Sequence, residues 1–146
     1  MTRIRVINGP NLNLLGRREP EQYGRRSLED IMQELVQFAA TCGVELEHMQ
    51  TNSEGEMVDA IQQMCADGID YIILNPAAYT HTSVAIRDAL LAVEIPFVEV
   101  HLSAVSSREP FRQTTYFSDI AIGVISGFRG ESYLLALQAI LNRIEP

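Results

Sequence analysis

Apolar and polar residues follow one another along the chain in short blocks that predict alternating strands and helices. Short apolar runs predict mostly buried strands over 4–7, 69–75, 96–102 and 120–126. Apolar residues at helical spacing predict helices over 27–42, 54–65, about 81–92 and 131–144. Residues 44–49 alternate between apolar and polar instead, which is typical of a half-exposed strand at the edge of a sheet.

The helix expected over 27–42 also has recognisable ends. Ser27 is a suitable N-cap, because its hydroxyl can accept a hydrogen bond from the first helical turn. Gly43 suits the position just after the helix, where left-handed backbone is common. Both ends therefore agree with the apolar spacing between them.

Five strands separated by helices predict an α/β fold, a three-layer sandwich whose helices cover both faces of a five-stranded parallel sheet. The alternating strand belongs at an edge, which suits the flavodoxin-like strand order 2-1-3-4-5. With 146 residues and neither a linker nor a repeat, the chain is expected to form a single domain, residues 1–146.

Composition excludes several classes of function. All 11 basic residues are arginine, so a Schiff-base lysine and a GxxxxGK phosphate loop are both impossible. A formal net charge of −8 argues against nucleic acid as a partner. No apolar run reaches the roughly 20 residues that span a membrane, and the first residues lack the pattern of a signal peptide. Cys42 and Cys65 do not form a CxxC pair, and we interpret them as buried thiols of a cytoplasmic protein.

Polar residues gather after every predicted strand, at the edge of the sheet where ligands bind in such folds. They are Asn8 and Asn11, Asn52, the run 75–82, the run 101–112, and the run 126–129. Because the carboxyl ends of parallel strands share one edge, these residues are expected to converge on one site.

The residues at this edge suit acid–base chemistry on a polyhydroxylated anion. Tyr23 and His101, with His81 as a further candidate, are the proton carriers, and Arg18, Arg108 and Arg112 can hold an anion or stabilise charge. Histidine, cysteine and carboxylate residues show no spacing typical of metal ligands, so we expect no metal site. Neither GxSxG nor GxGxxG occurs, which disfavours an α/β-hydrolase and a dinucleotide site.

Tyr23 lies in the arginine-rich stretch "GRREPEQYG", residues 16–24. A free tyrosine titrates near pH ~10, but a neighbouring guanidinium favours the phenolate and makes it a usable base. Simpler interpretations remain open from the residues alone. Tyr23 could be a surface residue, His101 a hydrogen-bonded core histidine, and Asp88 a partner of Arg87 or a subunit contact.

Several long motifs together resemble the type II 3-dehydroquinate dehydratases. They are "INGPNLNLLGRREPEQYG" near the start, "NPAAYTHTSVAIRDAL" at 75–90, "PFVEVHLS" at 96–103, "REPFR" at 108–112 and "GVISGFRGESYLLAL" near the end. The resemblance covers nearly the whole chain and implies a lyase of the shikimate pathway, active in aromatic amino acid biosynthesis. The implied reaction is the trans dehydration of 3-dehydroquinate to 3-dehydroshikimate through an enolate, without a metal or organic cofactor.

The same resemblance assigns roles to individual residues. Tyr23 would be the general base, Arg18 would keep it ionised on a loop that closes over substrate, and Asn11 would stabilise the enolate. His101 would protonate the departing hydroxyl, with Glu99 as the partner of its ring. The residues that would bind substrate are Asn75, His81, Leu102, Ser103, Arg112 and Asp88, the last reaching a neighbouring subunit's site. The assembly implied is a homo-oligomer, a dodecamer of four trimers.

Four positions depart from the pattern common in the family, namely Ala104, Ser106, Gln113 and Thr114. None replaces a proton carrier. The alternative function is a flavodoxin-like binding or signalling domain. A response regulator would need acidic residues at the ends of strands one and three, where this chain has Asn8 and Asn75, and a late lysine, which it lacks.

Overall fold

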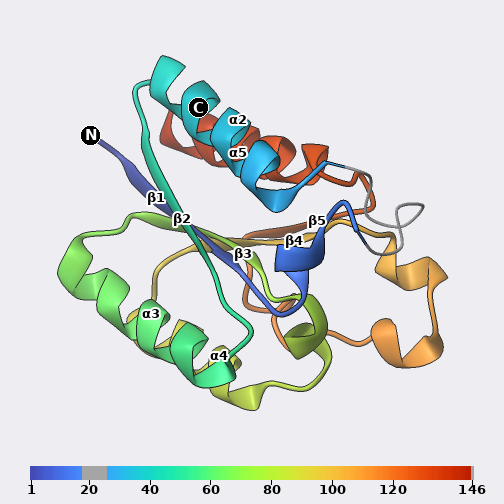
Figure 1. Cartoon of the computed structure of the whole chain (residues 1–146). Coiled ribbons are helices and arrows are strands. Elements are labelled where there is room, and N and C mark those ends of the chain that lie inside the picture. Colours follow the sequence, from blue (N-terminus) through green and yellow to red (C-terminus); the bar gives the residue numbers. More distant parts are fainter. Residues whose placement is uncertain (18–25, 146) are drawn as a thin grey trace.

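Helices cover both faces of a central sheet in the computed structural model, which describes residues 1–17 and 26–145 (Figure 1). The strands are β1 (Arg3–Asn8), β2 (Glu45–Gln50), β3 (Tyr71–Asn75), β4 (Phe97–His101) and β5 (Gly123–Ser126). The α-helices are α2 (Leu28–Thr41), α3 (Glu54–Asp67), α4 (Val84–Val93) and α5 (Glu131–Ile144). The 3₁₀ helices are η1 (Leu12–Leu14), η2 (Ala77–His81), η3 (Val105–Ser107) and η4 (Pro110–Arg112).

All four strand pairings are parallel and the strand order is β2-β1-β3-β4-β5, so the predicted flavodoxin-like topology is confirmed. Figure 1 shows α2 and α5 together on one face and α3 and α4 on the other. In the register of the central pair, Asn8 at the end of β1 lies beside Asn75 at the end of β3. The two amides therefore stand at the same edge of the sheet.

Side chains of each central strand alternate between two apolar cores, as the pleat of a strand requires. Ile73 packs with the α2 and α5 core, while Ile72 and Leu74 pack with the α3 and α4 core. Apolar side chains therefore pack on both faces of these inner strands, and Asn8, Asn75 and His101 place polar groups at their carboxyl ends.

The predicted ends of the first helix are confirmed. Ser27 accepts a hydrogen bond from Asp30 N–H at its N-terminus, and Gly43 has a φ of 74° just beyond its end. The observed ends of several other helices and strands differ from the predicted ends by a few residues. The helix expected over about 81–92 is α4, which begins at Val84 because the Ser83 side chain caps it by accepting from Ile86 N–H, and η2 precedes it.

Two predictions of burial are wrong. The strand over 120–126 is shorter and half-open, because β5 is an edge strand that pairs with β4 alone, and Val124 is 46% exposed. Cys42 and Cys65 are both exposed. Cys42 follows the last residue of α2, and Met64 takes the inward position on α3, which turns the next residue, Cys65, toward solvent.

None of the helices in the described ranges is both long enough and apolar enough to cross a membrane.

Gly9 lies in the turn between β1 and the pocket, where its backbone packs closely against the backbone of Asn75 and Pro76. Its N–H donates to Asn75 O at 2.8 Å, and a Cβ on Gly9 would lie 2.5 Å from the carbonyl oxygen of Pro76. We expect Gly9→Ala to lower the free energy of unfolding by about 1–3 kcal/mol, the usual cost of overpacking. Urea denaturation measures this difference.

The matched control is Gly55→Ala in α3, where the nearest atom to an added Cβ is 3.8 Å away. Alanine there should stabilise the protein by about 0.4–1 kcal/mol through the unfolded chain. Equal effects of the two substitutions would show that the contact between Gly9 and Pro76 does not restrict the turn.

Candidate active site

A pocket lies at the carboxyl ends of β1, β3 and β4, the edge of the sheet at which the polar residues were expected to converge. Its lining consists of Pro10, Asn11, Leu12, Asn75, Ala77, Ala78, His81, His101, Leu102, Ser103, Val105, Arg108 and Arg112. Seven of the predicted site residues are therefore brought together: Asn11, Asn75, His81, His101, Leu102, Ser103 and Arg112.

The remaining predicted residues lie elsewhere. Glu99 is fully buried behind His101 and does not reach the pocket surface. Asp88 is exposed on α4 and is not part of the pocket lining of its own chain. Its neighbour Arg87 pairs with Asp119, at 2.5 and 2.9 Å, so Asp88 is not the hydrogen-bonded partner of Arg87. Arg18 and Tyr23 lie outside the described residues.

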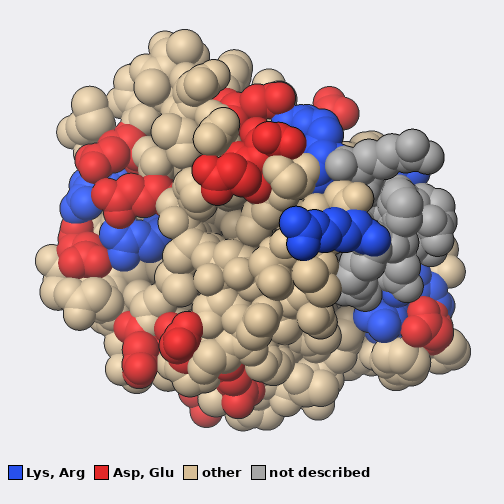
Figure 2. All heavy atoms as spheres, in the orientation of Figure 1, with Lys and Arg blue, Asp and Glu red and all other residues tan. Residues whose placement is uncertain are grey.

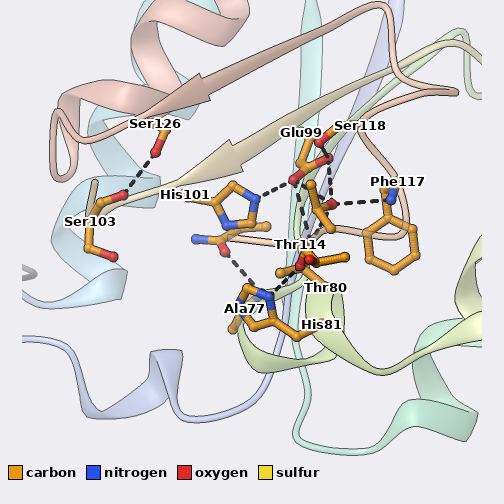
Figure 3. Close-up of polar contacts among 12 residues, drawn as sticks. Ala77, Thr80, His81, Glu99, His101, Ser103, Thr114, Phe117, Ser118 and Ser126 are labelled. Carbon is orange, nitrogen blue, oxygen red and sulfur yellow. Dashed lines mark hydrogen bonds and ion pairs between the residues drawn. The ribbon is translucent and has the colours of Figure 1, made fainter. Parts of the chain in front are cut away.

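His101 and Glu99 form a buried pair at the end of β4. The Nε2 of His101 contacts a carboxylate oxygen of Glu99, and their side chains are 5% and 0% exposed (Figure 3). A carboxylate only accepts, so Nε2 carries the proton and the ring nitrogen left for a ligand is Nδ1. The carboxylate thereby fixes the tautomer and the direction of the imidazole.

Three hydroxyls complete the surroundings of the Glu99 carboxylate. Ser118 donates to it at 2.9 Å, Thr115 at 3.1 Å and Thr80 at 3.4 Å. Figure 3 shows dashed contacts converging on the Glu99 carboxylate beside the ring of His101. Burial alone would raise the pKa of Glu99, but the hydrogen bond and charge of His101, with those of Ser118 and Thr115, hold it below its ordinary value.

Because the pKa of Glu99 is lower in the folded than in the unfolded chain, its contribution to stability is present above its ordinary pKa of 4.5 and is lost as pH falls from there through the folded value. We therefore expect the free energy of unfolding to decrease below about pH 4.5, and to decrease less steeply in Glu99→Gln. Chemical denaturation between pH 3 and 7 measures both slopes, with pH values chosen to bracket the ordinary carboxyl pKa of roughly 4.

The control for this comparison is Glu94→Gln, at an exposed position beyond the end of α4. It should leave the acid slope close to that of the wild type. Parallel slopes in the wild type and Glu99→Gln would mean that Glu99 is not held ionised by its partners.

His81 faces the pocket with a defined tautomer. Its Nδ1 lies 2.7 Å from the carbonyl oxygen of Thr114, an acceptor, so Nδ1 carries the proton and Nε2 is the acceptor of the neutral ring. The same bond ties η2 to the segment that follows η4, and Tyr116 N–H adds a second tie to Thr80 O at 2.9 Å.

Asn11 occupies a backbone conformation that few residues adopt readily. Its φ is 68°, and its N–H donates to the Oδ1 of Asn52 at 3.0 Å. Asparagine tolerates this left-handed region better than most residues. The Nε2 of Gln50 donates to the same oxygen of Asn52 at 3.1 Å, so the end of β2 supports the turn that carries Asn11.

The strand ends supply the remaining polar lining. Asn75 is buried, and its Oδ1 accepts from Ala77 N–H at 3.2 Å. Ser103 follows β4, and Ser126 of β5 donates to its carbonyl oxygen at 3.0 Å (Figure 3). These bonds hold the turns after β3 and β4 in place around the pocket.

Two arginines give the pocket positive charge. Arg112 Nε lies 3.0 Å from Glu109, which leaves the rest of its guanidinium near the pocket. Arg108 reaches Ser103 Oγ at 3.4 Å and Glu109 at 3.7 Å. Arg108, which the sequence indicated as a possible anion clamp, thus belongs to the lining although the resemblance assigned it no role.

Some arginines elsewhere on the surface also pair with carboxylates. Arg5, in the middle of β1, pairs with Glu47 of β2 at 2.7 Å and with Asp67 at the end of α3 at 2.9 Å. Figure 2 shows basic residues, in blue, next to acidic residues, in red, at both the left and the right of this face. The pocket nevertheless has local positive charge in an acidic chain, because Arg108 and Arg112 both line it and share the carboxylate of Glu109.

Sequence reasoning missed the hydroxyl groups behind Glu99. Thr115 and Ser118 follow η4 in a segment without regular secondary structure, and Thr80 is within η2. No periodic pattern marks them. A search for hydroxyl residues near a buried carboxylate needs the structure, because these residues are 16 to 19 positions from Glu99 along the chain.

Chemically, the pocket offers an imidazole oriented by a buried carboxylate, two amide side chains and two guanidinium groups. Such a set can move a proton and hold a small polyhydroxylated anion. Within residues 1–17 and 26–145, no group of three or more His, Cys, Asp or Glu residues is arranged to hold a metal ion.

Comparison with known proteins gives a consistent picture. Residues 2–141 match the family model described as dehydroquinase class II. The chain is 57% identical over 145 residues to the 3-dehydroquinate dehydratase of Legionella pneumophila (strain Corby), covering 99% of this chain and 100% of that protein. It is 55% identical over 143 residues to the Shewanella woodyi 3-dehydroquinate dehydratase, covering 98% and 94%.

Solved structures agree with the sequence relatives. The type II dehydroquinase from Butyrivibrio crossotus superposes with a TM-score of 0.93 at 42% identity, over 97% of both chains. The type II dehydroquinase from Propionibacterium acnes superposes with a TM-score of 0.92 at 38% identity, again over 97% of both.

Proposed function

We propose that this chain dehydrates 3-dehydroquinate to 3-dehydroshikimate, a lyase reaction of the shikimate pathway, because it belongs to the class II dehydroquinase family. The observation that carries the proposal is the buried pair of Glu99 and His101 at the end of β4, with Nδ1 of the ring left for a ligand in a pocket that also contains two arginines. The family match disfavours the alternative of a flavodoxin-like binding or signalling domain.

The reaction begins when Tyr23, as phenolate, takes a proton from C2 of the substrate. The C–H electrons form an enolate, whose oxygen Asn11 stabilises through a bound water. Arg18 keeps the tyrosine ionised, because a cation beside a phenol favours its charged form. The position of Asn11 in the pocket lining supports its role. The roles of Tyr23 and Arg18 are taken from the family resemblance.

The enolate then collapses and the C1–O bond breaks. His101 gives its proton to the departing hydroxyl, which leaves as water, and Glu99 stabilises the imidazolium before that transfer. Proton exchange with solvent afterwards returns Tyr23 to phenolate and His101 to its protonated form. The burial and hydrogen bonding of Glu99 support its role as the positioning partner of His101.

Substrate binding is assigned to the other residues of the lining. Arg112 faces the carboxylate, and Asn75, His81, Ser103 and the backbone at Leu102 bind hydroxyl and carboxylate oxygens. Their positions around one pocket support this assignment. The reaction needs no metal or cofactor in this proposal, since the acid, the base and the charge-stabilising groups are all side chains.

The proposal extends to the assembly. We infer a cytoplasmic homo-oligomer, a dodecamer of four trimers, in which Asp88 of one single-domain chain, residues 1–146, reaches the site of a neighbour. Apolar side chains exposed on and around the β5 edge support burial against another copy: Leu91, Ile122, Val124 and Phe128 are 47%, 36%, 46% and 58% exposed. Sedimentation equilibrium should give a mass near twelve chains, and a monomer would contradict this part.

The enzymatic proposal is tested by incubating purified protein with 3-dehydroquinate in metal-free buffer containing a chelator. A conjugated enone forms in the product, so ultraviolet absorbance should rise at a rate proportional to enzyme concentration. Added chelator should not change the rate. Absence of turnover would overturn the proposal.

A further inference from the structure

Tyr133 of α5 is connected to the pocket by hydrogen bonds at the carboxyl ends of β1 and β3. Its hydroxyl donates to Oδ1 of Asn8 at 2.6 Å and accepts from Nδ2 of Asn75 at 2.9 Å. Tyr133 and Asn8 are 0% exposed and Asn75 is 2% exposed. The contact joins positions 125 and 58 residues apart along the chain, and only Asn75 of the three lines the pocket.

The hydrogen bonds around Asn75 allow one orientation of its amide. Oδ1 accepts from the N–H of Ala77, and a backbone N–H can only donate. Nδ2 must therefore face Tyr133, and one of its two N–H groups is used there. The second N–H is the group with which Asn75 can bind a ligand in the pocket.

The other half of the contact fixes the direction of the Tyr133 hydroxyl. Asn8 Nδ2 lies 3.6 Å from the sulfur of Met32, a weak acceptor, so Asn8 Oδ1 is turned toward Tyr133. The single hydroxyl proton of Tyr133 goes to Asn8, which leaves its oxygen to accept from Asn75. Burial raises the pKa of Tyr133 above its ordinary value, so the hydroxyl keeps its proton throughout the range in which the enzyme would work.

We propose that Tyr133 is a positioning residue that acts through Asn75, holding the Asn75 amide so that one N–H points to the substrate. This inference rests on the proposed function, since it concerns the binding of the same substrate. Without the Tyr133 hydroxyl, Asn75 Nδ2 loses the hydrogen-bond partner that keeps the amide from rotating. The orientation in which one N–H points to the substrate is then no longer the only stable one. A tyrosine that merely filled the core between α2 and α5 would need no hydroxyl at this place.

A double-mutant cycle on turnover of 3-dehydroquinate separates these two roles. Tyr133→Phe is expected to raise KM about tenfold with a much smaller change in kcat, because one hydrogen bond to substrate is weakened. In the Asn75→Ala background the same substitution should change KM less than about twofold, since its route to the substrate is absent. Tyr71→Phe, on half-buried Tyr71 at the start of β3 and far from the pocket, is the matched control and should change neither constant.

Asn8→Ala tests the same contact if Tyr133→Phe does not fold. It keeps the tyrosine but removes the acceptor of its proton, and it should also raise KM only while Asn75 is present. Equal effects of Tyr133→Phe, or of Asn8→Ala, with and without Asn75 would overturn the inference and leave a structural tyrosine. These comparisons require that the wild type turns over 3-dehydroquinate. A wild type without turnover would contradict the proposed function, whereas equal effects in an active protein would contradict only the role of Tyr133.

Discussion

His101→Ala is expected to lower kcat for 3-dehydroquinate about 1000-fold, within the range usually lost with a general acid. The leaving hydroxyl would have to depart without a proton from the one imidazole that a buried carboxylate orients. The substitution removes little of the binding surface, so KM should change by less than about tenfold. Steady-state kinetics at several pH values measure both constants.

His48→Ala serves as the control for this variant. His48 is exposed on the edge strand β2 and is not part of the pocket lining, so its loss should leave kcat unchanged. Near-normal kcat in a folded His101→Ala protein would contradict the role given to His101.

Tyr23→Phe is expected to abolish nearly all turnover, with a fall in kcat of about 10²–10⁴-fold, because phenylalanine cannot take the C2 proton. The expected base is unusual, since a free phenol titrates near pH ~10 and needs a cationic neighbour to be ionised at neutral pH. Arg18→Ala should therefore shift the rise of kcat with pH toward higher pH. Stopped-flow or steady-state rates between pH 6 and 10 follow this shift.

Tyr116→Phe is the matched control for the loss of a phenol. Tyr116 is partly exposed, and it is its backbone that bonds to Thr80 and Arg87, so the variant should resemble the wild type. Turnover by Tyr23→Phe at a rate close to that of Tyr116→Phe would require another base.

The sequence predicted the fold because its signals are local. Ser27 and Gly43 mark the ends of α2, the alternation over 44–49 marks an edge strand, and the parallel connections leave few possible strand orders. Convergence of Asn11, Asn75 and His101 followed from topology alone, since each lies at or beyond the carboxyl end of a strand.

Other features depend on contacts that no local pattern records. The run over 120–126 is apolar enough for a central strand, yet β5 lies at the edge and leaves Val124 exposed. Tyr133 lies at helical spacing among core residues of α5, and nothing in that spacing tells that its hydroxyl reaches Asn8 and Asn75. The burial expected for Cys42 and Cys65 follows from the usual preference of free thiols, but Cys42 lies just after the last residue of α2 and Cys65 follows the inward-facing Met64, so both are exposed.

The central claim is that this pocket removes water from 3-dehydroquinate by proton transfers on opposite faces of the ring. Mass spectrometry of the product formed from substrate deuterated at the C2 position trans to the C1 hydroxyl tests it most directly. The account predicts a product that has lost the deuterium. Retention of deuterium at C2, with loss of the hydrogen on the same face as the hydroxyl, would contradict it.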